Sequence, residues 1–167
     1  MSRRTRALLA TWTAAVATSM VAYVNADPGR GMIILVRHAE RGTAAGPDPS
    51  LTDEGKSRAQ ILAEMLAPAG IRAIFTTGLK RTQETAKPLA TSLHIEPEVV
   101  SETNALVAAL KTHSNETVLV VGHSDTIPEV IKALGGPNVE IGDAEFDAVF
   151  VFVPATGAVT RFKYRNR

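Results

Sequence analysis

The sequence predicts an α/β domain built around a mostly parallel sheet. From Met32 onward, short apolar or β-branched runs alternate with stretches of helical periodicity, and a short turn near the end predicts a hairpin. The expected strands are 32–36, 71–76, 97–100, 117–121, 147–153 and 158–164. The turn Pro154-Ala155-Thr156-Gly157 joins the last two and makes them antiparallel.

Four stretches between these strands have the apolar spacing of helices. They are 53–67, 79–93, 102–112 and a fourth that stops at Gly135-Gly136. Thr52 stands at the N-cap position of the first helix, and Ser124 or Asp125 at that of the fourth. Pro88 lies inside the second, where it predicts a kink or an early end.

The first 26 residues have the pattern of a signal peptide. Residues 1–6 are basic, residues 7–26 carry no charge, and Val24-Asn25-Ala26 places small residues before a cleavage point. We therefore expect a signal peptide over 1–26, a single domain over 27–167, and a periplasmic or secreted location. The alternative is an uncleaved anchor that carries an exported domain, because twenty uncharged residues are long enough to cross a bilayer.

The composition excludes several classes of function. The net charge is +1, and because Arg3, Arg4 and Arg6 belong to the leader, the remaining domain is slightly acidic. A nucleic-acid partner is therefore not expected. The chain has no cysteine, which excludes a disulfide framework, a thiolate metal site and a cysteine nucleophile.

Charged and polar groups follow three of the expected parallel strands. Residues 37–41 read RHAER, residues 76–81 read TTGLKR and residues 122–125 read GHSD. Ligands of an open parallel sheet bind beyond the carboxyl ends of its strands, so we expect these segments to converge. An acidic run at Asp143, Glu145 and Asp147 is expected to be an exposed loop instead.

Clustered imidazoles and guanidinium groups imply an anion. The planar fork of arginine suits phosphate oxygens, and a neutral histidine nitrogen can attack a bound phosphoryl group in line. Preplaced donors would then stabilise the charge of the transition state.

Four motifs together resemble the histidine phosphatase superfamily (phosphoglycerate mutase-like, branch 1). The resemblance covers nearly all of 32–136, and its compact spacing is similar to that of the small SixA-like members. It implies the three-layer αβα fold of that family. The motifs are VRHAER (36–41), LTDEG (51–55), TGLKRTQETA (77–86) and VVGHSDT (120–126).

The resemblance also implies roles for individual residues. His38 would be the phosphorylated nucleophile and His123 a donor to a non-bridging oxygen. Arg37 and Arg81 would bind the phosphoryl oxygens, with Arg41 in support at the mouth of the pocket.

The family protonates the leaving oxygen with a carboxylic acid. We expect Glu102 in this role first and Asp125 second, with a pKa above that of a free carboxylic acid. For both residues the alternative is a structural role at a helix N-terminus.

These residues predict a metal-independent phosphomonoester hydrolase of the histidine acid type, without a cofactor. Its substrate would be a small phosphorylated molecule or a phosphoprotein, and no stable membrane insertion is expected once the leader is removed. Two alternatives are a non-catalytic phosphate-binding protein on the same fold and a metal hydrolase. The metal hydrolase would use His38, Glu40, His123 and Asp125 as ligands.

Overall fold

The computed structural model describes residues 31–43 and 46–164, so the predicted signal peptide lies outside the described residues. Strands and helices alternate along the chain, as the periodicity predicts. Their order is β1 (Met32–Arg37), α2 (Asp53–Leu66), the 3₁₀ turn η1 (Ala67–Ala69), β2 (Ile71–Thr76), α3 (Lys80–Leu93), β3 (Glu98–Val99), α4 (Thr103–Thr112), β4 (Thr117–Gly122), α5 (Thr126–Ala133), β5 (Ala148–Val153) and β6 (Ala158–Lys163).

The strands form one mixed sheet in the order β3-β2-β4-β1-β5-β6. The first four in this order are parallel to one another, and β5 and β6 form an antiparallel hairpin beside β1, which confirms the predicted fold class. Arg37 at the end of β1 is in register with Gly122 at the end of β4, so the residues after both strands leave the sheet at the same edge.

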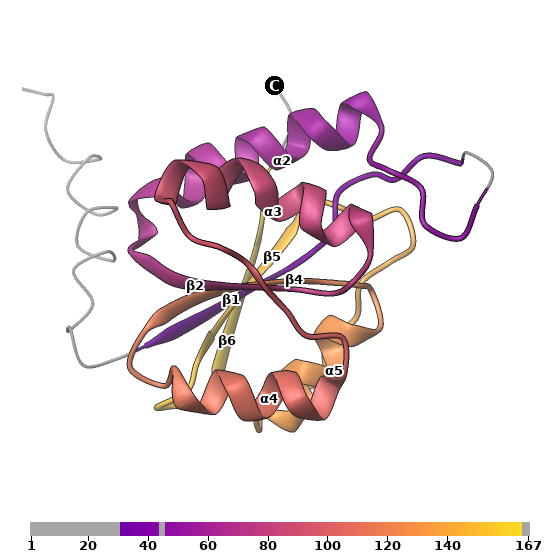
Figure 1. The fold of residues 1–167 in the computed structure, drawn as a ribbon. Coiled ribbons are helices and arrows are strands. Elements are labelled where there is room, and N and C mark those ends of the chain that lie inside the picture. Colours follow the sequence, from indigo (N-terminus) through magenta and orange to yellow (C-terminus); the bar gives the residue numbers. More distant parts are fainter. Residues whose placement is uncertain (1–30, 44–45, 165–167) are drawn as a thin grey trace, which may run out of the picture.

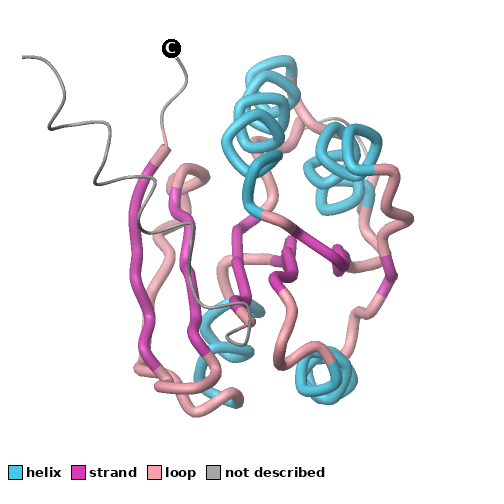
Figure 2. The backbone as a smooth tube through the Cα atoms, turned by 90° about the vertical axis from the view of Figure 1, so that its left-hand side faces the viewer, coloured by secondary structure: helices cyan, strands magenta, loops and turns pink. Residues whose placement is uncertain are grey.

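Helices cover both faces of the sheet in three layers (Figure 1; Figure 2). The α2 and α3 helices lie on one face, over Ile34 and Val36 of β1. The α4 and α5 helices lie on the other, over Ile33 and Leu35. The central strand is therefore an unbroken apolar run because both of its faces are buried.

The helix ends follow from local hydrogen bonding. Thr52 caps α2 as predicted, and its hydroxyl accepts from the Gly55 N–H at 3.1 Å. Leu79 has no side-chain acceptor for the start of α3, and the carboxylate of Asp48 replaces it by accepting from the Lys80 N–H at 3.0 Å. Pro88 does not end α3 early, because the helix continues to Leu93.

No helix among the residues described is both long enough and apolar enough to cross a bilayer.

The segment that precedes β5 is more firmly held than the sequence predicts. Glu145 lies against β6, where its carboxylate contacts Lys163 Nζ at 2.9 Å and also Arg161. The same carboxylate accepts from the Gly142 N–H at 3.3 Å. The expectation of an exposed acidic loop is wrong for Glu145, because the antiparallel hairpin places two cations opposite it.

Acid should weaken this attachment. The hydrogen bond from Lys163, and next that from Arg161, lowers the pKa of Glu145 from 4.5 to about 2. A group whose pKa is lowered by folding stabilises the folded state above its unfolded pKa and loses that contribution as the pH falls. We expect the difference in urea midpoint between the wild type and Glu145→Gln to shrink as the pH falls from 4.5 towards 2.

The matched control is Glu140→Gln, because Glu140 is exposed and should produce no such pH-dependent difference. A Glu145→Gln difference that is constant across this pH range would contradict the assignment.

Candidate active site

The carboxyl ends of β1, β2 and β4 bring the two predicted histidines together. His38 follows β1 and His123 follows β4, and their ring centroids lie 5.3 Å apart in an edge-on arrangement. Because β5 runs antiparallel to β1, its amino-terminal end meets the same edge. The site is therefore built from three strand ends and the segment that precedes β5.

His38 is almost completely buried, at 3% exposure, and is held by main-chain contacts. Its N–H donates to the carbonyl of Gly122 at 2.9 Å, and its Nδ1 lies 2.7 Å from the carbonyl oxygen of Ala39. A carbonyl oxygen can only accept, so this contact assigns the proton of the neutral ring to Nδ1. The lone pair is then on Nε2.

Burial keeps His38 neutral. It lowers the pKa from 6.5 to about 4, against the hydrogen bond to Ala39, which raises it. The neighbouring His123, Arg81 and Arg37 lower it further. At neutral pH the Nε2 lone pair of His38 is therefore available to an electrophile.

His123 is positioned by a hydroxyl from the end of β2. Its Nε2 lies 3.1 Å from Thr77 Oγ1, which in turn lies 3.0 Å from Thr82 Oγ1 at the start of α3. Its Nδ1 is buried without a hydrogen-bond partner among the described residues. Burial, followed by the charge of Arg81, lowers the pKa of His123.

Arg37 is clamped by the segment before β5. Its Nη1 donates to the carbonyls of Gly142 and Asp143 at 2.9 and 2.8 Å, and more weakly to that of Glu145 at 3.3 Å. Its guanidinium carbon lies 4.2 Å from the ring centroid of Phe146, a cation–π contact. The Phe146 ring also lies 6.0 Å from His38, so this residue belongs to the site although the sequence analysis missed it.

Arg81 and Arg41 complete the cationic cluster. Arg81 lies in the first turn of α3, and burial, followed by the charge of Arg41, lowers its pKa. Arg41 is exposed and forms a single β-bridge with Leu51. Burial also lowers the pKa of Arg37, and both other arginines contribute. The three guanidinium groups thus lie close enough to repel one another.

Several donors of this cluster have no protein acceptor. Among the described residues, the buried side-chain atoms without a partner include Arg37 Nε, Arg81 Nε and His123 Nδ1. Buried polar groups are normally hydrogen-bonded, and these three come from three separate elements. A tetrahedral anion between them would accept from all three, so the arrangement fits a phosphoryl group.

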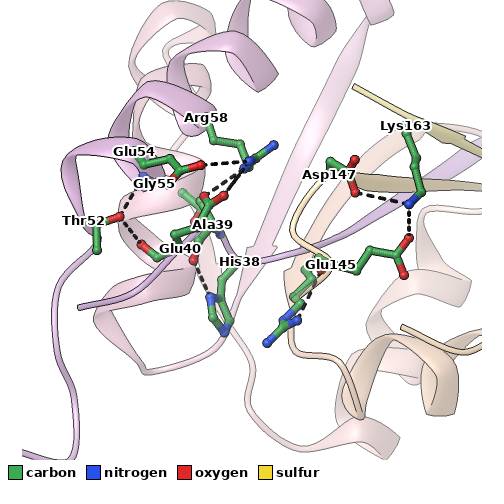
Figure 3. A network of polar contacts seen from close by, with 12 residues as sticks. His38, Ala39, Glu40, Thr52, Glu54, Gly55, Arg58, Glu145, Asp147 and Lys163 are labelled. Atoms are coloured by element: carbon green, nitrogen blue, oxygen red, sulfur yellow. Dashed lines mark hydrogen bonds and ion pairs between the residues drawn. The ribbon is translucent and has the colours of Figure 1, made fainter. Parts of the chain in front are cut away.

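Glu40 faces away from this cluster. Its carboxylate accepts from Arg58 Nε at 2.7 and 2.8 Å, and its carbonyl accepts from the Thr52 N–H at 2.9 Å (Figure 3). Gly55 packs so closely that a Cβ there would lie 2.2 Å from the Glu40 carbonyl oxygen. Glu40 thus joins the His38 segment to α2 by a nearly buried ion pair, and it is not a site carboxylate.

This position removes one ligand from the metal-hydrolase alternative. Among residues 31–43 and 46–164, no three His, Asp or Glu side chains are grouped so that they could hold a metal ion.

The two carboxylates expected as proton donors lie in different surroundings. Glu102 is exposed at the N-cap of α4, without a capping hydrogen bond from its side chain, and no described hydrogen bond or ion pair joins it to the cluster. Asp125 caps α5 and is close enough to Arg37, Arg81 and His123 to influence the pKa of each.

The expectation of a raised pKa is wrong for Asp125 in the free protein. Burial raises the pKa of Asp125, but hydrogen bonds from the main chain and hydroxyl of Thr126 act against it, and the pKa is lowered overall. Asp125 is therefore ionised at neutral pH while no anion is bound.

An open cavity of about 570 Å³ lies in front of Arg37. Arg41 and Thr43 line one side of it, and Asp143 and Phe146 line the other. Asp143 is thus a carboxylate at the site that the sequence analysis assigned to a solvent loop. The cavity adjoins the cationic cluster through Arg37 and Arg41.

Known proteins are similar to this chain in sequence and in architecture. PE-PGRS family protein PE_PGRS11 of Mycobacterium tuberculosis is 36% identical over 93 residues, which cover 49% of this chain and 16% of that protein. The chain thus matches only a small part of this relative's length.

Among solved structures, the protein histidine phosphatase SixA in complex with tungstate has a TM-score of 0.64 at 18% identity, covering 78% of this chain and 94% of that one. Phosphoserine phosphatase of Entamoeba histolytica, in complex with 3-phosphoglyceric acid, has a TM-score of 0.62 at 16% identity, covering 82% and 98%. At these identities the likeness establishes the fold.

The family model of the histidine phosphatase superfamily (branch 1) matches residues 33–104, the segment that contains His38, Arg37 and Arg81. The motifs, the three-layer fold and this match agree in their likeness to the histidine phosphatase superfamily.

Proposed function

We propose that this protein hydrolyses phosphomonoesters through a covalent phosphohistidine on His38. The observation that carries the proposal is the fixed ring of His38. Its Nδ1 is bound to the Ala39 carbonyl at 2.7 Å, so the Nε2 lone pair is free, beside a cluster of donors without acceptors. The match of residues 33–104 to the histidine phosphatase superfamily supports the same reaction.

The reaction would have two steps. In the first, the Nε2 lone pair of His38 forms a bond to phosphorus while the bond from phosphorus to the ester oxygen breaks, and the leaving alkoxide takes a proton. In the second, water attacks phosphorus and gives a proton to the carboxylate that supplied one in the first step, while the P–N bond breaks and its electrons return to Nε2. Inorganic phosphate leaves, and the ring is regenerated as the neutral imidazole.

The cluster would stabilise charge on the transferring group in both steps. Arg81 and the free Nε of Arg37 would donate to its oxygens, and His123 would donate through Nδ1 once protonated. The dianion itself favours that protonation, because a nearby negative charge raises the pKa of an imidazole. Arg41, at the rim, would add attraction for the incoming anion.

Asp125 is favoured over Glu102 as the proton donor. The charge of Asp125 affects the pKa of Arg37, Arg81 and His123, which supports this role. Glu102 has no described contact with these groups. A bound dianion would raise the pKa of Asp125 and so favour its acid form.

The substrate and location remain part of the proposal. The open cavity beside Arg37 accommodates either a small phosphorylated molecule or a phosphorylated side chain on a protein. The leader-like residues 1–26 support a periplasmic or secreted location, with a membrane-anchored exported domain as the alternative.

The phosphoenzyme can be tested directly. Protein quenched without acid during turnover of an aryl phosphate should carry a phosphate adduct on His38 by mass spectrometry, and His38→Ala should abolish both adduct and turnover. Exposed His94→Ala is the matched control and should keep both. Full turnover in His38→Ala would disprove the mechanism.

Two further measurements separate the alternatives. Phosphate binding without turnover on a broad panel of phosphoesters would favour a non-catalytic binding protein. Loss of turnover after exhaustive EDTA treatment would favour a metal hydrolase.

Arg81→Ala should lower the turnover rate on the order of 10²–10³-fold, as expected for one preorganised charge-stabilising donor. Lys80→Ala is the control, because it removes the adjacent exposed cation and should have little effect. Steady-state kinetics of both variants decide this prediction, and equal losses would mean that only general positive charge matters.

The proton donor should be revealed by the leaving group. Asp125→Asn should slow hydrolysis of an alkyl phosphate much more than that of a nitrophenyl phosphate, because the weakly basic nitrophenolate leaves without a proton. Glu102→Gln should slow both equally or neither. If Glu102→Gln alone shows the leaving-group dependence, the assignments are reversed.

A further inference from the structure

We propose that Thr85 is a positioning residue, whose hydroxyl fixes Ala39 so that the Ala39 carbonyl holds His38 in the tautomer with a free Nε2. The inference rests on the proposed role of His38 and adds a residue that the mechanism proposed above does not use. Thr85 does not touch the reacting atoms. It acts through one intervening residue.

The contacts form a continuous series of hydrogen bonds from α3 to the His38 ring. Thr85 Oγ1 donates to the Arg81 carbonyl at 2.7 Å and accepts from the Ala39 N–H at 2.9 Å. The carbonyl of the same Ala39 accepts from His38 Nδ1 at 2.7 Å. One turn of α3 is thereby connected to the imidazole across 46 positions of sequence.

The residues that form these hydrogen bonds are shielded from water. Thr85 is 1% exposed, Ala39 is 0% exposed and His38 is 3% exposed. A buried N–H that loses its acceptor cannot be satisfied by bulk solvent, so the Ala39 segment would have to shift to find another. Any such shift moves the Ala39 carbonyl, because the N–H and the carbonyl flank a single Cα.

A hydroxyl is the group that this position requires. It accepts from the Ala39 N–H and donates to the Arg81 carbonyl at the same time, and serine could do both. Valine has nearly the same shape but can do neither. Comparison of the two substitutions therefore separates hydrogen bonding from packing.

The effect on His38 concerns its tautomer and not the binding of substrate. With the Ala39 carbonyl displaced, the proton of the neutral ring is free to occupy Nε2, and that tautomer has no lone pair directed at phosphorus. The phosphoryl-binding groups of Arg37 and Arg81 do not depend on the Ala39 N–H. We therefore expect kcat to fall and KM to stay unchanged.

The test compares Thr85→Val with Thr85→Ser in the full chain, using a generic aryl phosphate and ¹⁵N NMR of the His38 ring. Thr85→Val should lower kcat by about 10–100-fold, a loss typical of removing an outer hydrogen-bonding group that orients a functional histidine. It should also change the His38 nitrogen shifts from a single Nδ1–H tautomer to a mixture. Thr85→Ser should restore both.

Thr112→Val is the matched control, because Thr112 makes the same kind of hydroxyl-to-carbonyl bond within an exposed stretch of α4, to Ala109 at 2.7 Å. It should change neither kcat nor the His38 tautomer. If Thr85→Val fails to fold, Thr85→Cys replaces it, with a similar size and a much weaker hydrogen-bonding group; the chain has no other cysteine with which it could pair.

Wild-type kcat and tautomer in Thr85→Val would overturn the inference, and so would a Thr85→Ser variant as impaired as Thr85→Val. A rise in KM with kcat unchanged would also overturn it. These outcomes differ from failure of the proposed function, in which His38→Ala itself retains turnover.

Discussion

Repulsion among like charges at one edge of the sheet is the constraint on which the rest of the site depends. Beside burial, the charges of Arg41 and Arg81 lower the pKa of Arg37, and the charge of Arg41 lowers that of Arg81. Both imidazoles are kept neutral beside them. Fixed acceptors and an aromatic ring hold Arg37 in this position, and α3 holds Arg81. Such an arrangement is costly in the free protein and would be favourable around a dianion, as the proposed binding of a phosphoryl group requires.

The five residues RHAER divide into two functional groups. Arg37, His38 and Arg41 belong to the cationic cluster and its histidines, while Ala39 and Glu40 are hydrogen-bonded to helices. Glu40 is bound to Arg58 of α2, and Ala39 is bound to Thr85 of α3. The reactive side chains can therefore lie in a loop and still be rigid, because each neighbour is fixed to a different helix on the same face of the sheet.

The sequence predicts the strands and most of the site because both follow from local rules. Apolar periodicity locates the elements, and parallel strands bring the residues after β1, β2 and β4 to one edge. Phe146 was missed because its place depends on β5 pairing antiparallel with β1, which no local pattern states. The contacts of Glu40 with Arg58 and of Ala39 with Thr85 were not predicted, because Arg58 and Thr85 lie on helices, 18 and 46 positions further along the sequence. The pKa of Asp125 depends on its own helix cap at Thr126, a detail of side-chain geometry.

The protonation states of the free site differ from those that the reaction needs, and the substrate itself supplies the difference. In the free protein Asp125 is ionised and His123 is neutral, so neither is ready to give a proton. A dianion placed among them raises the proton affinity of both at once, because negative charge stabilises an imidazolium and destabilises a carboxylate. His38 would be subject to the same field, yet in the proposed mechanism it would give its lone pair to phosphorus as the ester bond breaks. Binding of the anion would thus prepare the acid and the second histidine in a single event.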